Sequence, residues 1–155
     1  MTRAVLALGS NLGEREQTMA EAVRRIADAD GVELVAVSTF HESVALTPDG
    51  PDAEAPAYLN AVAIVETTLD PDQLLALANA VEAELGRVRG ERWADRTLDV
   101  DIIAFGDVTV ATERLTIPHP RAAERDFVLA PWLEIDGAAV LPGHGRVDEL
   151  LDALR

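Results

Sequence analysis

The chain has 155 residues, of which 48% are hydrophobic and 26% are charged, a composition typical of a globular protein rather than a disordered one. This length suits one domain, so we expect residues 1–155 to form a single domain. Cysteine is absent, which excludes disulfides and thiolate chemistry. No apolar run approaches the roughly 18 residues that span a membrane, and the N-terminus lacks signal-peptide features, so we expect a soluble cytoplasmic protein.

The formal net charge is −15, and every basic side chain is arginine. The absence of lysine excludes a Walker A lysine and Schiff-base chemistry. Residues 87–125 hold seven arginines and seven acidic residues and are therefore neutral, whereas the rest of the chain is strongly acidic. An acidic surface repels nucleic acids and anionic membranes, so we expect neither as a partner, and the neutral segment predicts a small local anion site. Arginines that only form surface ion pairs are the alternative.

Hydrophobic periodicity predicts four strands and two helices in the first 105 residues. A strand over 4–8 is followed by a helix that continues to Ala29, and a strand of β-branched residues over 32–39 follows Gly31. The proline-rich segment 43–56 is predicted as a long loop. A strand over 58–65, a helix over 71–85 opened by Asp70-Pro71 and a strand over 98–105 complete the series.

The predicted order βαββαβ indicates an α+β, ferredoxin-like sandwich, in which the helices pack on one face of an antiparallel sheet. Three further elements are expected in the C-terminal part of the chain. They are a short hairpin strand over 108–111, a helix over 122–133 and a final amphipathic helix over 147–154.

The sharpest motif is Asp99-Val100-Asp101 at the start of a predicted strand. Side chains alternate along a strand, so both carboxylates lie on one face with Cα atoms about 6.6 Å apart. Two neighbouring carboxylates call for cations, and paired hard oxygen ligands suit Mg²⁺ with substrate phosphates. The alternative is an exposed edge strand with a solvated polar face.

Four arginines precede this pair, at positions 87, 89, 92 and 96, with Gly90 and Trp93 among them. Guanidinium groups match phosphate oxygens bidentately, so the segment has the composition of a metal-bridged polyphosphate site. An internal ion-pair network between the arginines and the nearby carboxylates is the alternative. Trp93 either covers the core or caps a ligand.

Five segments in order resemble the 6-hydroxymethyl-7,8-dihydropterin pyrophosphokinase family of folate synthesis, and the resemblance runs nearly end to end. The segments are Gly9-Ser10-Asn11-Leu12-Gly13, Tyr58-Leu59-Asn60, Gly86 to Trp93, Arg96-x-x-Asp99-x-Asp101, and Ile117 to Arg121 followed by Glu124 to Phe127. The family's ferredoxin-like fold agrees with the element order predicted above.

The resemblance implies a metal and nucleotide site. Asp99 and Asp101 would hold two Mg²⁺ ions on the triphosphate of ATP, the co-substrate. The residues implied around ATP are Asn79, Glu82, Arg87, Arg89, Arg92, Trp93, Arg114, Thr116, His119 and Arg125. Arg87, Arg92 and Arg96 would act in catalysis with the two aspartates. His119, flanked by prolines, is otherwise a turn residue.

The resemblance also implies a pterin site, with the ring between Tyr58 and Phe127 and Asn60 reading its edge. Gly9, Ser43, Val44, Leu46 and Asp99 would complete this site. A flat heteroaromatic ring suits two ring faces and an amide that both donates and accepts, and the chain has only six aromatic residues. Ordinary core packing of Tyr58 and Phe127 is the alternative.

We therefore expect an ATP-dependent diphosphotransferase that transfers diphosphate from ATP to 6-hydroxymethyl-7,8-dihydropterin and releases AMP, acting as a monomer. Such a reaction needs positioning and charge neutralisation rather than a covalent nucleophile. Two alternatives stay open on the residues alone: a metal-dependent phosphohydrolase that uses the same aspartates, and a non-enzymatic ferredoxin-like module that binds a small molecule.

Overall fold

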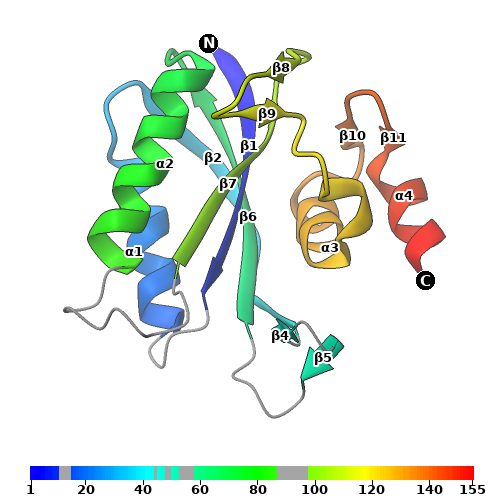
Figure 1. Cartoon of the computed structure of the whole chain (residues 1–155). Helices are drawn as coiled ribbons and strands as arrows, with labels where there is room; N and C mark the ends of the chain where they lie inside the picture. Colours follow the sequence, from blue (N-terminus) through cyan, green and yellow to red (C-terminus); the bar gives the residue numbers. More distant parts are fainter. Residues whose placement is uncertain (11–14, 44, 48–49, 53–57, 87–97) are drawn as a thin grey trace.

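The structure, a computed structural model, describes residues 1–10, 15–43, 45–47, 50–52, 58–86 and 98–155. Its central sheet contains β1 (Thr2–Ser10), β2 (Val32–Val37), β3 (His41–Ser43), β6 (Tyr58–Thr67) and β7 (Leu98–Phe105). The strands follow the order β2-β6-β1-β7, with β3 also paired to β6, and every pairing is antiparallel. This is the predicted ferredoxin-like arrangement, with β1 and β6 in the middle of the sheet (Figure 1).

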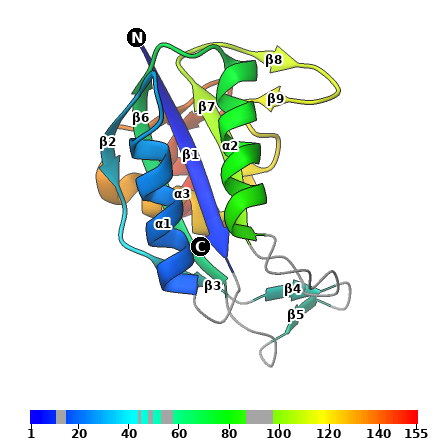
Figure 2. The same ribbon diagram turned by 90° about the vertical axis from the view of Figure 1, so that its left-hand side faces the viewer.

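Two helices, α1 (Arg15–Ala27) and α2 (Pro71–Gly86), cover one face of the sheet (Figure 2). The start of α2 is encoded locally. Asp70 Oδ1 accepts the Gln73 N–H at 2.8 Å while Gln73 Oε1 accepts the Asp70 N–H at 2.9 Å, and Pro71 occupies the first helical position. This reciprocal cap satisfies two backbone donors at the helix start. The core beneath the helices is apolar and includes Leu6, Met19, Ile26, Leu74 and Ile102.

The opposite face of the sheet is covered by α3 (Asp126–Ile135), and α4 (Val147–Leu154) packs against α3. A second apolar core forms there from Ile64, Ile103, Leu129 and Trp132, among other residues. The element order predicted helices on one face only, and the two C-terminal helices add a second helical layer. The sheet can carry helices on both faces because Val62 and Ile64 alternate with Ala61, Ala63 and Val65, and all of these side chains are buried.

The helix predicted over 122–133 is divided at Arg125. A short 3₁₀ helix, η1 (Ala122–Glu124), ends there, and Arg125 is extended, with φ −116° and ψ 103°. Its carbonyl then accepts the N–H groups of Val128 and Leu129, each at 3.0 Å, and so begins α3. The break redirects the chain two residues before Phe127.

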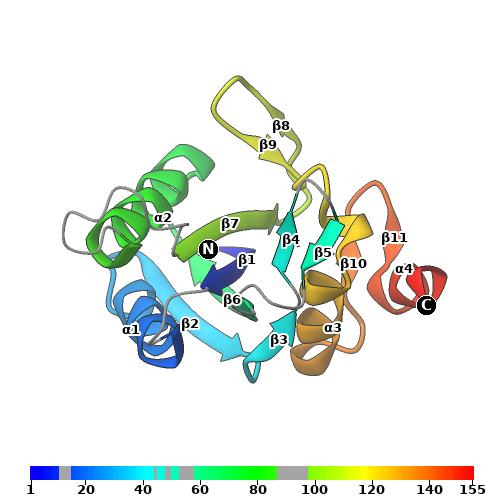
Figure 3. The same ribbon diagram turned by 60° about the horizontal axis from the view of Figure 1, so that its bottom comes forward.

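The loop predicted over 43–56 is wrong in part, because two short strands lie within it. β4 (Ala45–Thr47) and β5 (Gly50–Asp52) pair with each other at the end of the molecule where β6 begins (Figures 1 and 3). Pro51 is compatible with such a strand because a two-stranded pair needs ladder donors on one side only. Two further pairs are β8 (Val110–Ala111) with β9 (Thr116–Ile117), which confirms the predicted hairpin, and β10 (Val140–Leu141) with β11 (Gly145–Arg146).

Candidate active site

Three strands bring polar side chains to one end of the sheet, where β1 ends and β6 and β7 begin, on the face that α3 covers. Gly9 on the central strand β1 lies opposite Asn60 on β6 and opposite Asp99 on β7. Two residues earlier, Ala7 lies opposite Asp101. The side-chain period of two places all these residues on one face. Ala7 and Gly9, the two smallest of these residues, therefore form a floor between Asn60 and the two aspartates.

A pocket of about 250 Å³ lies over this floor, and we call it the Asn60 pocket. Its lining residues are Ala7, Leu8, Gly9, Tyr58, Asn60, Asp99, Asp101, Arg125, Phe127 and Val128. The Arg125 guanidinium lies 5.6 Å from the centre of the Phe127 ring, a distance at which a cation is attracted to an aromatic face. The pocket thus combines aromatic walls with an amide, two carboxylates and a guanidinium.

A second pocket, of about 350 Å³, lies beside α2 and the β8–β9 hairpin, and we call it the Glu82 pocket. Its polar lining residues are Asn79, Glu82, Asp101, Glu113, Arg114, Thr116 and His119. Arg114 is exposed, and its guanidinium lies 3.5 Å from the Asp72 carboxylate of α2. Asp101 lines both pockets, so a group bound in one lies next to a group bound in the other at this carboxylate.

Glu82 connects the second pocket to the sheet. Its Oε2 accepts the backbone N–H of Val100 at 2.7 Å. Within the described residues β7 pairs only with β1, so its outward N–H groups need other acceptors. The Val100 N–H bond therefore fixes Glu82 on α2 directly beside the strand that carries the two aspartates.

His119 reaches the Glu82 pocket from the segment after β9. Burial lowers the pKa of His119, the charges of Arg125 and Arg121 lower it further, and the Asp101 carboxylate partly opposes this shift. Nδ1 of His119 accepts the Arg121 N–H at 3.2 Å, so a neutral ring carries its proton on Nε2. His119 is thus arranged as a neutral hydrogen-bond donor.

The structure brings most of the described candidate residues into one of the two pockets. Arg125, which was expected around ATP, lines the Asn60 pocket. Ser43 pairs with Tyr58, and Leu46 pairs with Pro51. Six other candidates lie outside the described residues, and they are Val44, Arg87, Arg89, Arg92, Trp93 and Arg96.

Some residues of the pockets were not predicted. Ala7 is the most informative, because its small side chain leaves the space next to Asp101 open. A signal for it existed, since Ala7 is two residues before Gly9 and therefore on the same face of the strand. Val128 and Glu113 gave no comparable signal.

The donor set at Asp99 and Asp101 fits Mg²⁺. Within the described residues no cluster of three or more metal-binding side chains occurs, so these two carboxylates do not form a closed protein site. Mg²⁺ usually takes one or two carboxylates and completes its octahedron with water and phosphate oxygens. The arrangement therefore suits a magnesium ion that arrives with a phosphorylated ligand.

Comparison with known proteins agrees with this geometry. The model of the 7,8-dihydro-6-hydroxymethylpterin-pyrophosphokinase (HPPK) family matches residues 5–137. The chain belongs to this family. Proteins named 2-amino-4-hydroxy-6-hydroxymethyldihydropteridine pyrophosphokinase are similar to it: that of Haemophilus influenzae is 41% identical over 97% of this chain and 92% of its own length, and that of Bacillus subtilis is 42% identical over 85% and 77%.

Solved structures support the same fold. HPPK-DHPS from Plasmodium falciparum matches with a TM-score of 0.73 over 98% of this chain, at 13% identity. The present chain covers 45% of that protein. At this identity the likeness concerns the fold alone, and it confirms the ferredoxin-like prediction.

None of the helices in the described part of the chain combines the length and the apolar character that crossing a membrane requires.

Proposed function

We infer that the chain transfers diphosphate from ATP to 6-hydroxymethyl-7,8-dihydropterin in folate biosynthesis, the activity that membership of the family carries. In this reaction the hydroxymethyl oxygen forms a bond to the β-phosphorus of ATP, the bond from that phosphorus to the α,β-bridging oxygen breaks, and AMP leaves. The alcohol proton is released. One observation carries the assignment of the two pockets to the two substrates. Asp101 lines both pockets, and it therefore marks where the substrates would meet.

The Asn60 pocket is proposed to bind the pterin. Its aromatic side chains suit a flat ring, with Phe127 and Tyr58 as the two walls. Asn60 is only 6% exposed and donates through Nδ2 to the His41 carbonyl at 3.4 Å. Because a carbonyl only accepts hydrogen bonds, the amide nitrogen must face His41, and the amide oxygen faces the opposite way, over Gly9. An acceptor there suits the N–H groups at the edge of a pterin. Ser43, Val44 and Leu46 are proposed to complete this edge.

The Glu82 pocket is proposed to bind ATP. Thr116 and Asn79 supply uncharged donors and acceptors for the nucleoside, and Arg114 supplies a guanidinium for the phosphates. His119, neutral and protonated on Nε2, donates without adding charge. Arg125 is proposed to contact the transferred group from the pterin side.

Asp99 and Asp101 are proposed to hold two Mg²⁺ ions together with the triphosphate. When bound, Mg²⁺ supplies charge neutralisation for the phosphate oxygens during transfer. The role of the two aspartates is to fix the position of the triphosphate between the pockets. Arg87, Arg89, Arg92, Trp93 and Arg96 are proposed to surround the same phosphates, with Arg87, Arg92 and Arg96 catalytic.

We also propose that residues 1–155 form one domain that acts as a monomer in the cytoplasm. The shared sheet supports a single domain, because one apolar core lies on each of its faces. Light scattering at assay concentration tests the monomer, and a concentration-independent mass of about 16.6 kDa is expected.

One incubation tests the reaction. ATP labelled in the γ-phosphate is supplied with Mg²⁺, with and without 6-hydroxymethyl-7,8-dihydropterin. We expect AMP and a labelled pterin diphosphate in a one-to-one ratio, and no AMP without the pterin. ADP with a pterin monophosphate would overturn the diphosphate assignment. Hydrolysis of ATP without pterin would favour a phosphohydrolase, and no consumption at all would favour a binding module.

A further inference from the structure

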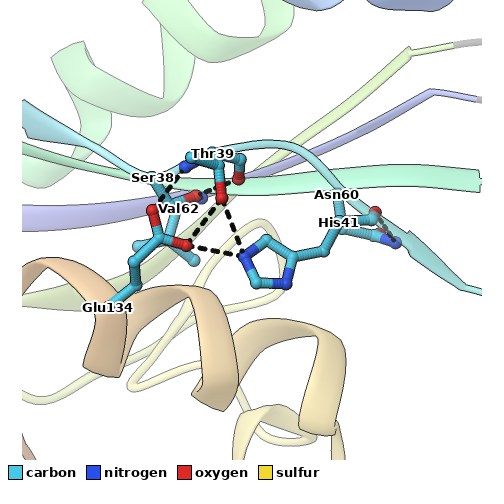
Figure 4. Close-up of polar contacts among 6 residues, drawn as sticks. All are labelled: Ser38, Thr39, His41, Asn60, Val62 and Glu134. Atoms are coloured by element: carbon cyan, nitrogen blue, oxygen red, sulfur yellow. Dashed lines mark hydrogen bonds and ion pairs between the residues drawn. The ribbon is translucent and has the colours of Figure 1, made fainter.

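A hydrogen-bond cluster outside both pockets joins the end of α3 to the segment that leads into β3. The Glu134 carboxylate accepts the Thr39 backbone N–H on Oε2 at 2.7 Å and the Thr39 hydroxyl on Oε1 at 2.8 Å. His41 Nε2 lies 2.7 Å from the same Oε1 and 3.3 Å from the Thr39 hydroxyl (Figure 4). Because a carboxylate only accepts, His41 Nε2 carries a proton. We call these three residues the Glu134 cluster.

The cluster continues to Asn60, which lines the Asn60 pocket. His41 is the first residue of β3 and lies directly opposite Asn60 on β6. Its carbonyl accepts the Asn60 Nδ2 group, the contact that sets which end of the amide lies over Gly9. His41 thus connects Glu134 with the Asn60 amide, because its ring contacts Glu134 and its carbonyl accepts the hydrogen bond from Asn60. This amide is the group proposed to recognise the pterin.

The segment before the cluster is held independently. Ser38 N–H donates to the Val62 carbonyl at 2.9 Å, and Val62 N–H donates to the Ser38 hydroxyl at 3.0 Å. Beyond Ser38, β3 has only three residues paired with β6. The side chains of His41 and Glu134 are about one-third exposed, so water competes for their hydrogen bonds. The connection of β3 to α3 therefore depends on one carboxylate that accepts three hydrogen bonds.

We propose that Glu134 is a positioning residue for the pterin site. Through Thr39 and His41 it holds β3, which orients Asn60, against α3. The first turn of α3 carries Phe127, which lines the same pocket. This inference rests on the proposed function of the Asn60 pocket. A carboxylate suits the task better than an amide, since both oxygens must accept. The donors from Thr39 and His41 also lower the pKa of Glu134, consistent with an ionised carboxylate at neutral pH.

The test is Glu134→Gln, which keeps the volume but turns an NH₂ group toward at least one donor. Binding of 6-hydroxymethylpterin, a fluorescent compound, is measured by fluorescence titration in the presence of a non-hydrolysable ATP analogue. The KM for ATP is measured separately. We expect the Kd for the pterin to rise about tenfold, the loss of one well-made polar contact, with the KM for ATP changed by less than about twofold. Glu149→Gln on α4 is the matched control, since Glu149 is an exposed helix carboxylate outside both pockets, and it should change neither value.

A second pair of variants separates positioning from folding. His41→Gln retains a side-chain donor toward Glu134 and should bind the pterin within about threefold of the unmodified protein, whereas His41→Leu should reproduce the tenfold loss. Faster exchange of the Thr39 amide hydrogen in Glu134→Gln is expected as well. An unchanged pterin Kd in both Glu134→Gln and His41→Leu would overturn the inference, as would equal losses for pterin and ATP.

Failure of the proposed function would look different. It would appear in the unmodified protein, as absence of pterin binding or of AMP formation. The inference about Glu134 is judged only by the ratio between variant and unmodified protein.

Discussion

Gly9 and Asn60 lie opposite each other on β1 and β6, and a Cβ atom added to Gly9 would lie 3.2 Å from the Oδ1 atom of Asn60. That distance is tighter than ordinary van der Waals contact, so a side chain at position 9 must displace the Asn60 amide. Gly9 is therefore required by the site rather than by its backbone, which is an ordinary strand conformation.

The first prediction is that Gly9→Ala weakens pterin binding without weakening the fold. The added methyl group displaces the Asn60 oxygen from its position over the pocket. Distortion or loss of one hydrogen bond to the ring costs about 1–2 kcal/mol, or a five- to thirtyfold rise in the pterin Kd. The free energy of unfolding should change by less than about 1 kcal/mol, because the gain of alanine over glycine in a strand offsets the crowding at Asn60. Titration and urea unfolding measure the two quantities. Gly137→Ala, where an added Cβ meets nothing within 4 Å, is the control.

The second prediction concerns the metal-binding charge. Asp101→Asn keeps the volume of the side chain but removes a negative charge that lines both pockets and that is proposed to bind Mg²⁺. Turnover at saturating Mg²⁺ should fall by about 10² or more, given the usual contribution of groups that stabilise phosphoryl transfer. Asp107→Asn, an exposed aspartate beyond the other end of β7, should leave turnover unchanged. Turnover of Asp101→Asn at the level of the unmodified protein would remove the metal role.

A third prediction tests the bond from Val100 to Glu82. Glu82→Ala leaves the Val100 N–H without this acceptor, so the free energy of unfolding should fall by about 1–3 kcal/mol. The KM for ATP should also rise, since Glu82 lines the proposed nucleotide pocket. Glu82→Gln retains a carbonyl acceptor and should recover most of the stability. If both variants unfold at the same urea concentration as the unmodified protein, the bond does not hold the helix to the strand.

The fourth prediction is a pH dependence at Glu134. Hydrogen bonds from Thr39 and His41 lower its pKa below the ordinary value of 4.5. The unfolded chain then binds more protons than the folded one in acid, so the stabilisation is full above about pH 4.5 and is lost as the pH falls through the folded pKa. At pH 7 Glu134→Gln should be less stable by up to about 1 kcal/mol, a small value because the group is solvated. Urea unfolding at pH 7 and at successively lower pH below 4.5 should show the difference shrinking, and a difference that stays constant throughout would contradict the assignment.

Local periodicity in the sequence determined much of the fold and part of the site. The alternation of Asp99 and Asp101 with Leu98 and Val100 follows from the geometry of a single strand. The start of α2 follows from Asp70, Pro71 and Gln73. These features depend on residues a few positions apart. The order of such elements was sufficient to predict the ferredoxin-like sheet, and the five motifs were sufficient to indicate the family.

The tertiary structure decided what depends on register and packing between distant segments. Only the pairing of β1 with both β6 and β7 places Gly9 between Asn60 and Asp99, and no local pattern encodes that register. The break at Arg125, which moves its side chain to the Asn60 pocket, interrupts a helical pattern that continues in the sequence. Glu134 meets Thr39 across 95 residues, because α3 packs on the face of the sheet opposite α1 and α2. Contacts of this kind are fixed by the burial of both faces of the sheet, a property of the whole chain rather than of any one segment.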